Sequence, residues 1–196
     1  MVATAKADDV TGVHSRMATW TVEFGGGVGG SSTFSSNVVP TANLTYNLGS
    51  TAKWWNNIYG TAIHAQYADL AENYLADKFY NPGTVLMFGG DQEVTVADAD
   101  TKAVAGVVST NPSYIMNAGI DGLPVALRGR VPCKVIGPVA KGDLLVTSDV
   151  EGHAKSLNQY QDWVVTFNID SGNSVFAKSL EDNDNAGPIT VEVAVV

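Results

Sequence analysis

The stretch VALRGRVPCKVIGPVAKGDLLVTS, residues 125–148, decides the fold class. It contains three short runs rich in valine, leucine and isoleucine, at 125–127, 131–136 and 143–147, separated by glycine, proline and charged residues. Short β-branched runs bounded by turn residues predict β-strands. No helical pattern of crossover length lies between them, so a barrel or sandwich is expected rather than a parallel α/β sheet.

The same pattern of short apolar runs separated by turn residues continues on both sides of this stretch. Turn pairs such as Pro82-Gly83 and Gly89-Gly90 separate further short apolar runs after Tyr80. The terminal run ITVEVAVV is apolar enough to be paired in a sheet rather than frayed. The sequence therefore predicts a mainly β protein with a C-terminal β-barrel-like or sandwich-like domain over residues 81–196. The six further strands expected in it are 84–88, 93–96, 103–108, 163–167, 174–178 and 189–196.

Residues 41–80 are expected to form an aromatic connector with a short helix. Trp54 and Trp55, two of the chain's four tryptophans, lie close to Ile58 and Tyr59. A segment of this length cannot enclose so much aromatic surface by itself. We therefore expect Trp54 or Trp55, with Tyr59, to be a buried anchor against the β-domain or a neighbouring subunit.

The helix of this connector is expected between residues 63 and 74. Ile63, Tyr67, Leu70 and Tyr74 recur at spacings of four, three and four, and five alanines in this region add helix propensity. The spacing also fits a heptad seam, but it covers barely two heptads. A helix packed on its own domain is therefore favoured.

Residues 1–40 are expected to be an extended, glycine-rich and serine-rich N-terminal attachment region. The run GGGVGGSSTFSSN at 25–37 has the composition of a flexible linker. In an assembly of several subunits, glycine would also permit close approach of backbones, so both interpretations stay open.

Composition restricts the partners. Of the 196 residues, 45% are hydrophobic and only 16% are charged, which is too apolar for disorder and indicates a surface partly covered by other subunits. The net charge of −9 is opposite to the basic surface that binds nucleic acid. The opening MVATAKADDV is not a signal peptide and no apolar run is long enough for membrane insertion, so neither is expected.

No cluster of reactive residues predicts an enzyme, a metal site or a cofactor. His64, Asp69 and Glu72 do not share the spacing of one helix face, so a solvated face is favoured over a metal site. The acidic residues Asp91, Glu93, Asp98 and Asp100 lack the register of a calcium loop and are expected around a hairpin. We therefore name no catalytic, cofactor-binding or metal-binding residue.

Two side chains nevertheless invite a nucleophile hypothesis. Cys133 lies in a strand-like run with no histidine at a paired spacing, so a buried structural thiol is favoured. Ser148, followed by Asp149, could attack a peptide bond only with a base and oxyanion donors, and the sequence indicates no base. The chain is expected to stay intact.

Two segments carry a resemblance to known families. NLGSTAKWWNNIYG at 47–60 resembles an element common in bacteriophage tail-fibre and appendage proteins. Residues 65–196, through AQYADLAENY, NPGTVLMFGG, VAGVVSTNPSYIMN and the stretch 125–148, resemble the C-terminal β-domain of virion proteins of marine phages, especially cyanophages. The same domain is similar to an autoproteolytic cleavage domain of phage appendages, although no residue here matches that family's nucleophile.

The resemblance implies a homotrimeric virion component, made in the host cytoplasm, that acts in attachment or assembly as part of a tail fibre or appendage. Its partners would be tail, baseplate or capsid proteins and a host-surface glycan. A capsid decoration protein, an autoproteolytic assembly domain and a carbohydrate-binding module are the alternatives. Any host recognition is expected on the loops at 111–117 and 149–156, whose Asn, Ser, Tyr and His side chains suit sugar hydroxyls.

Overall fold

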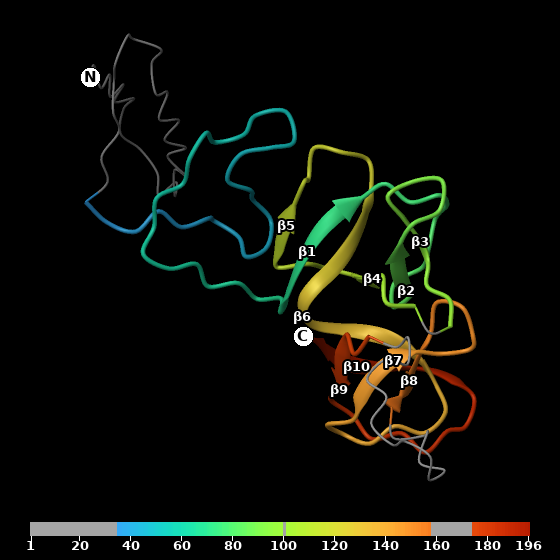
Figure 1. Cartoon of the computed structure of the whole chain (residues 1–196). Coiled ribbons are helices and arrows are strands. Elements are labelled where there is room, and N and C mark those ends of the chain that lie inside the picture. Colours follow the sequence, from blue (N-terminus) through green and yellow to red (C-terminus); the bar gives the residue numbers. More distant parts are fainter. Residues whose placement is uncertain (1–34, 100, 158–173) are drawn as a thin grey trace, which may run out of the picture. The chain divides into compact units, whose positions relative to one another are not determined.

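The computed structural model describes residues 35–99, 101–157 and 174–196 (Figure 1). The chain divides into two units, Met1–Ser50 and Thr51–Val196. The described part of the first unit, residues 35–50, consists of exposed turns and bends. The second unit carries the ten strands found among the described residues, and the protein is mainly β, as the sequence predicts.

Five strands of the second unit close into a barrel. β6 pairs with β10 on one side and with β8 on the other, and β7 and β9 complete the circuit between β8 and β10. The β6–β8 pairing is parallel and the other four are antiparallel. The expected barrel is thereby confirmed. Its strands are β6 (Leu123–Ile136), β7 (Leu144–Thr147), β8 (Ala154–Ser156), β9 (Ala177–Ser179) and β10 (Pro188–Val195).

The N-terminal half of β6 leaves the barrel and becomes the middle of a second group of strands, as Figure 1 shows. There β1 pairs with one edge of β6 and β4 with the other, while β5 adds to β1 and β2 connects β4 to β3. One strand therefore joins both halves of the unit. The strands of this group are β1 (Asp69–Tyr74), β2 (Val85–Phe88), β3 (Val94–Val96), β4 (Val104–Val108) and β5 (Tyr114–Met116).

The length of β6 differs from the expectation of two strands, 125–127 and 131–136. The strand runs through the charged residues between them, because Gly129 adopts a positive φ of 109°. A Cβ at Gly129 would overlap the carbonyl oxygen of Ala68, so only glycine lets the two backbones meet there. The pairing of β6 with β10 ends at this residue and its pairing with β1 begins there, since Gly129 is paired with both Val195 and Asp69.

The hydrophobic core follows the alternation of β6. Val131, Cys133 and Val135 are buried and point into the barrel, while the residues between them are half-buried. This is the period of two expected for a strand with one buried face. A second cluster, which includes Leu86, Val94, Val108 and Val125, lies among β2, β3, β4 and the start of β6.

The helix expected between residues 63 and 74 is wrong. Residues 69–74 form β1 instead, and 63–68 are irregular. In β1 the inward side chains are Asp69 and Ala71, whereas Leu70 is only half-buried. The helical stripe of apolar residues therefore does not coincide with the buried face, and pairing with both β5 and β6 overrides local helix propensity.

Most other strand predictions coincide with observed strands within a few residues. Those near 84–88, 93–96, 103–108, 143–147 and 189–196 are confirmed by β2, β3, β4, β7 and β10. The prediction at 174–178 overlaps β9, and 163–167 lies outside the described residues. β5 and β8 were not expected; they arise inside the two predicted recognition loops, 111–117 and 149–156.

Candidate functional site

The most conspicuous surface of the second unit is an exposed segment at residues 51–68, called the arm below. Every residue of the arm is exposed. Trp54, Trp55 and Tyr59 retain 66%, 60% and 92% of their accessible surface, and Ile58 and Ile63 are exposed as well. Single exposed apolar residues are common on proteins, but several large ones close together in the sequence are typical of an interaction surface.

Trp54 makes a hydrogen bond within the arm although it is exposed. Its indole Nε1 donates a hydrogen bond of 2.9 Å to the carbonyl oxygen of Thr51, three residues earlier. The bond satisfies the ring's polar atom. A partner that covers Trp54 would therefore not have to supply an acceptor for this N–H.

These exposures contradict one of the two burial sites expected for the aromatic connector. Neither Trp54, Trp55 nor Tyr59 is buried against the β-domain of its own chain. Burial against a neighbouring subunit stays a prediction.

A polar cleft lies where the arm enters the β-domain. Its volume is about 480 Å³, within the range of small-molecule sites. The side chains of Tyr67, Asn111 and Arg130 contribute an aromatic ring, an amide and a guanidinium group to one hollow. The remaining lining residues are Gln66, Ala68, Asp69, Thr110, Pro132 and Glu192.

The charged groups of the cleft are held in different ways. Arg130 Nε lies 3.9 Å from Glu192 Oε1, and its side chain is 61% exposed, so the guanidinium group can still bind a ligand. Asp69 is buried and accepts a hydrogen bond of 2.6 Å from Ser109 Oγ. Ser113 donates both its backbone N–H and its hydroxyl to the Asp69 carbonyl oxygen. The carboxylate is thus a fixed wall of the cleft rather than a mobile acid.

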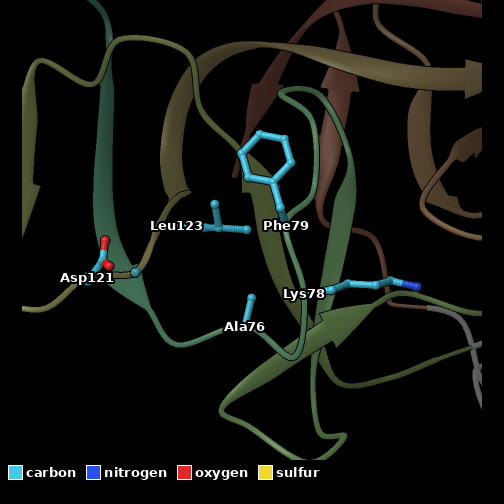
Figure 2. Close-up of a pocket in the computed structure, with 6 residues that line it drawn as sticks. Ala76, Lys78, Phe79, Asp121 and Leu123 are labelled. Atoms are coloured by element: carbon cyan, nitrogen blue, oxygen red, sulfur yellow. The ribbon is translucent and has the colours of Figure 1, made fainter.

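A smaller hollow of about 190 Å³ lies on another part of the β-domain (Figure 2). Phe79, Leu123 and Ala76 provide its apolar side chains, and Lys78, Asp121 and Gly122 complete the lining. Asp121 and Lys78 lie on opposite sides of it in Figure 2. The Lys78 ammonium group is 5.4 Å from the centre of the Tyr80 ring, so it is directed to that ring. Asp121 is therefore the charged group at the rim.

Cys133 and Ser148, the two residues considered as nucleophiles, have structural roles. Cys133 is completely buried, and burial raises the pKa of its thiol to about 12, which keeps it protonated and unreactive. Ser148 is buried, donates its hydroxyl to the Val150 carbonyl oxygen and accepts from the Val150 N–H. These two hydrogen bonds between Ser148 and Val150 stabilise a turn.

The structure does not bring together those considered metal ligands that it describes; Asp100 lies outside the described residues. In the part of the chain that it describes, no group of three His, Cys, Asp or Glu side chains could hold a metal ion. Glu72 accepts a hydrogen bond of 2.9 Å from the Tyr74 hydroxyl, and Glu93 accepts one of 2.8 Å from the Leu75 N–H. Both carboxylates therefore act in local structure.

The sequence patterns did not predict the cleft or the hollow. The cleft combines residues near 66–69, 110–111, 130–132 and 192, which meet only because β1 and β10 follow β6. Only Asn111 belongs to a loop that was expected to take part in recognition. The arm was visible in advance, because its aromatic residues exceed what a short segment can bury.

No protein-family model matches the chain, and no curated protein is found to be similar to it. Among the described residues, no helix has the length and apolar character needed to cross a membrane.

Proposed function

We propose that the protein is a structural subunit of a phage virion, a homotrimeric component of a tail fibre or appendage that acts in attachment or assembly. The observation that carries this proposal is the arm, whose large apolar side chains are exposed in a single chain. Side chains of this kind form the centres of protein interfaces. The tail-fibre-like segment 47–60 contains the first part of the arm, including both tryptophans.

The low charge density supports the same proposal. Only 16% of residues are charged, whereas about a quarter is usual in globular domains. A surface poor in charge is suited to burial against other subunits.

Light scattering of the purified chain in dilute neutral buffer tests the oligomeric state. The expected mass is that of three copies of the 20.6 kDa chain. A monodisperse monomer at micromolar concentration would contradict the proposal. Gold-labelled antibodies on intact virions then separate a tail-fibre position from the capsid surface, where a decoration protein would be found.

An autoproteolytic assembly domain is the alternative with a chemical test. The turn around Ser148 supplies no base for its hydroxyl, since its described partners are backbone groups. We expect intact-mass spectrometry after long incubation, with and without ATP, to give the full chain. A defined pair of fragments that a single serine substitution abolishes would establish the alternative.

The polar cleft favours a second function, binding of a host-surface glycan. Sugar rings stack their C–H faces on aromatic rings and exchange hydrogen bonds with amide, guanidinium and carboxylate groups. Tyr67, Asn111, Arg130 and Glu192 supply these groups in one cleft. Because the chain carries a net charge of −9, a neutral saccharide is favoured over an anionic one.

An array of neutral and sialylated oligosaccharides tests this second function. Binding of neutral saccharides should fall at least tenfold in Asn111→Ala and Arg130→Ala. His153→Ala, in the other expected recognition loop, is the matched control and should bind normally. Loss of binding in His153→Ala alone would move the site to residues 149–156, and no binding by the parent chain would remove the function.

A further inference from the structure

We propose that the hollow at Phe79 and Leu123 receives the Trp54 side chain of a second copy of this chain. The inference rests on the proposed trimer and names its contact. It pairs two features that the single chain leaves open: an exposed indole whose N–H is hydrogen-bonded, and a hollow bordered by the exposed Phe79 side chain.

The size of the hollow fits one side chain. Its volume of about 190 Å³ is below the roughly 300–1,000 Å³ typical of small-molecule sites. Phe79 keeps 74% of its surface exposed, although most phenylalanine side chains are buried in folded proteins. An aromatic ring placed on Phe79 and Leu123 would cover apolar surface at both partners and permit an edge-to-face or offset contact with the Phe79 ring.

Gly122, one of the residues that line the hollow, is packed tightly against the end of β1. Gly122 lies so close to β1 that a Cβ there would approach the Tyr74 carbonyl oxygen to 2.6 Å. The Tyr74 ring in turn makes an edge contact with Phe88, with ring centroids 5.6 Å apart. A pocket whose walls are already packed loses little entropy when it is filled.

Charge supports the same partner. Lys53 directly precedes Trp54 and is exposed, while Asp121 is exposed at the rim of the hollow. The two ion pairs of the described residues, Arg130–Glu192 and Lys155–Asp149, use neither Lys53 nor Asp121. When Trp54 enters the hollow, the ammonium group of Lys53 would come near the carboxylate of Asp121.

Trp54 is favoured over Trp55 because its indole N–H is already satisfied within the arm. The apolar side chains of the hollow, Phe79, Leu123 and Ala76, offer no acceptor for an indole N–H, and its one carboxylate, Asp121, lies at the rim. A tryptophan with a free N–H would leave a donor unpaired on burial, which is unfavourable.

Such a contact joins different surfaces of the two copies, the arm of one and the β-domain of the next. Contacts of this kind generate rings when the rotation between copies closes. Three copies, each giving its arm to the next, would fill three hollows and leave no arm free. The contact is therefore consistent with a closed trimer.

The experiment introduces cysteines beside the contact, so that Trp54 and Phe79 stay in place. The full-length double variant Lys53→Cys with Asp121→Cys is treated with a short bis-maleimide cross-linker and analysed by denaturing electrophoresis. Native Cys133 gives no background, because its thiol is buried and protonated. Lys53→Cys with Val150→Cys is the matched control, because Val150 is exposed elsewhere on the β-domain.

The expected result is a ladder of covalent dimers and trimers for the Asp121 pair that exceeds the control at least tenfold. Light scattering of Phe79→Ser should show a dissociation constant raised at least tenfold. A trimer that persists in Phe79→Ser, with no excess cross-linking, would overturn this contact and leave the proposed trimer standing. A cross-link within one chain would also overturn it, and a monomeric parent chain would overturn both proposals.

Discussion

Buried polar side chains pin the start of β1. Asp69 lies on the inward face of a strand, where burial of a charge is unfavourable unless partners compensate for lost water. Ser109, forty residues later, supplies a hydroxyl to its carboxylate at 2.6 Å. The pair joins β1 to the end of β4 and also fixes one wall of the polar cleft.

Ser109→Ala should therefore destabilise the fold. It leaves a buried carboxylate without its hydroxyl donor, which typically costs about 1–3 kcal/mol. Urea denaturation followed by circular dichroism measures this free energy. Thr110→Ala, which removes an exposed hydroxyl at the next position, should stay within about 0.5 kcal/mol of the parent. Equal effects of the two substitutions would argue against a structural role of the Asp69–Ser109 bond.

Cys133 provides a second test at the scale of one residue. Burial raises the pKa of its thiol to about 12, so the folded state holds the proton more tightly than the unfolded chain. This contribution to stability is fully present below the ordinary thiol pKa of about 9 and is lost as the pH rises toward 12. Between these values the free energy of unfolding should fall by about 1.4 kcal/mol per pH unit relative to Cys133→Ala.

The same burial predicts how the thiol reacts. Iodoacetamide at pH 8.5 should leave Cys133 unmodified in the native protein and alkylate it fully in urea. Mass spectrometry before and after unfolding distinguishes the two states. Rapid modification of the native chain would show that the interior of the barrel is open to reagents.

Among the elements, β6 takes part in the most strand pairings. It belongs to both groups of strands, and Gly129 is paired both with Asp69 of β1 and with Val195 of β10. Gly129→Ala should cost more than about 3 kcal/mol, because the φ of 109° is strained for alanine and the added Cβ overlaps the Ala68 carbonyl oxygen. Differential scanning calorimetry gives the shift in Tm.

The matched control for this change is Gly142→Ala. Gly142 also has a positive φ, of 94°, but an added Cβ there meets nothing within 4 Å. It should therefore cost only the backbone strain, about 1–2 kcal/mol. Equal losses of stability at both glycines would mean that the close approach of β1 to β6 contributes nothing.

Sequence reasoning recovered the elements whose buried faces are apolar. The strands near 84–88, 103–108 and 189–196 were predictable because valine and leucine occupy their buried positions. β1 was not, because its inward face begins with Asp69 and is stabilised by a serine forty residues away. β8, Ala154–Ser156, is short and polar, and it is a strand only because β6 and β7 pair with it. Neither pairing partner can be recognised from the few residues that surround β8 in the sequence.

For the candidate site, the sequence predicted which segment would be important but not its surroundings. The excess of aromatic residues in the arm could be read directly, since Trp54, Trp55 and Tyr59 lie within six residues. The hollow at Phe79 and Leu123 could not, because residues 76–79 and 121–123 are brought together by strand pairing between β1 and β6.

At the scale of the whole molecule, the second unit contains both a closed barrel and an exposed arm. The barrel pairs its own strands in the circuit from β6 to β10, so these strand edges need no strand from another chain. The arm has large apolar side chains that are mostly exposed in the single chain. We therefore expect folding and assembly to be separable in this protein.

The double variant Trp54→Ser with Trp55→Ser tests this separation. Because both side chains are exposed in the single chain, their loss should leave the fold of the barrel intact, with an unchanged circular dichroism spectrum. Each buried interface tryptophan typically contributes about 2 kcal/mol or more, which is roughly a thirtyfold change in the dissociation constant. Light scattering over a dilution series should therefore show monomers where the parent is trimeric.

The parent and the variant should also differ in how stability depends on concentration. Association stabilises the folded state by mass action, so the Tm of the parent should rise with protein concentration and that of the variant should not. Tyr114→Ser, which removes an exposed aromatic residue from β5 outside the arm, is the control and should behave like the parent. If the tryptophan variant unfolded at every concentration, the arm would be part of the folded core. If it remained trimeric, assembly would depend on another surface.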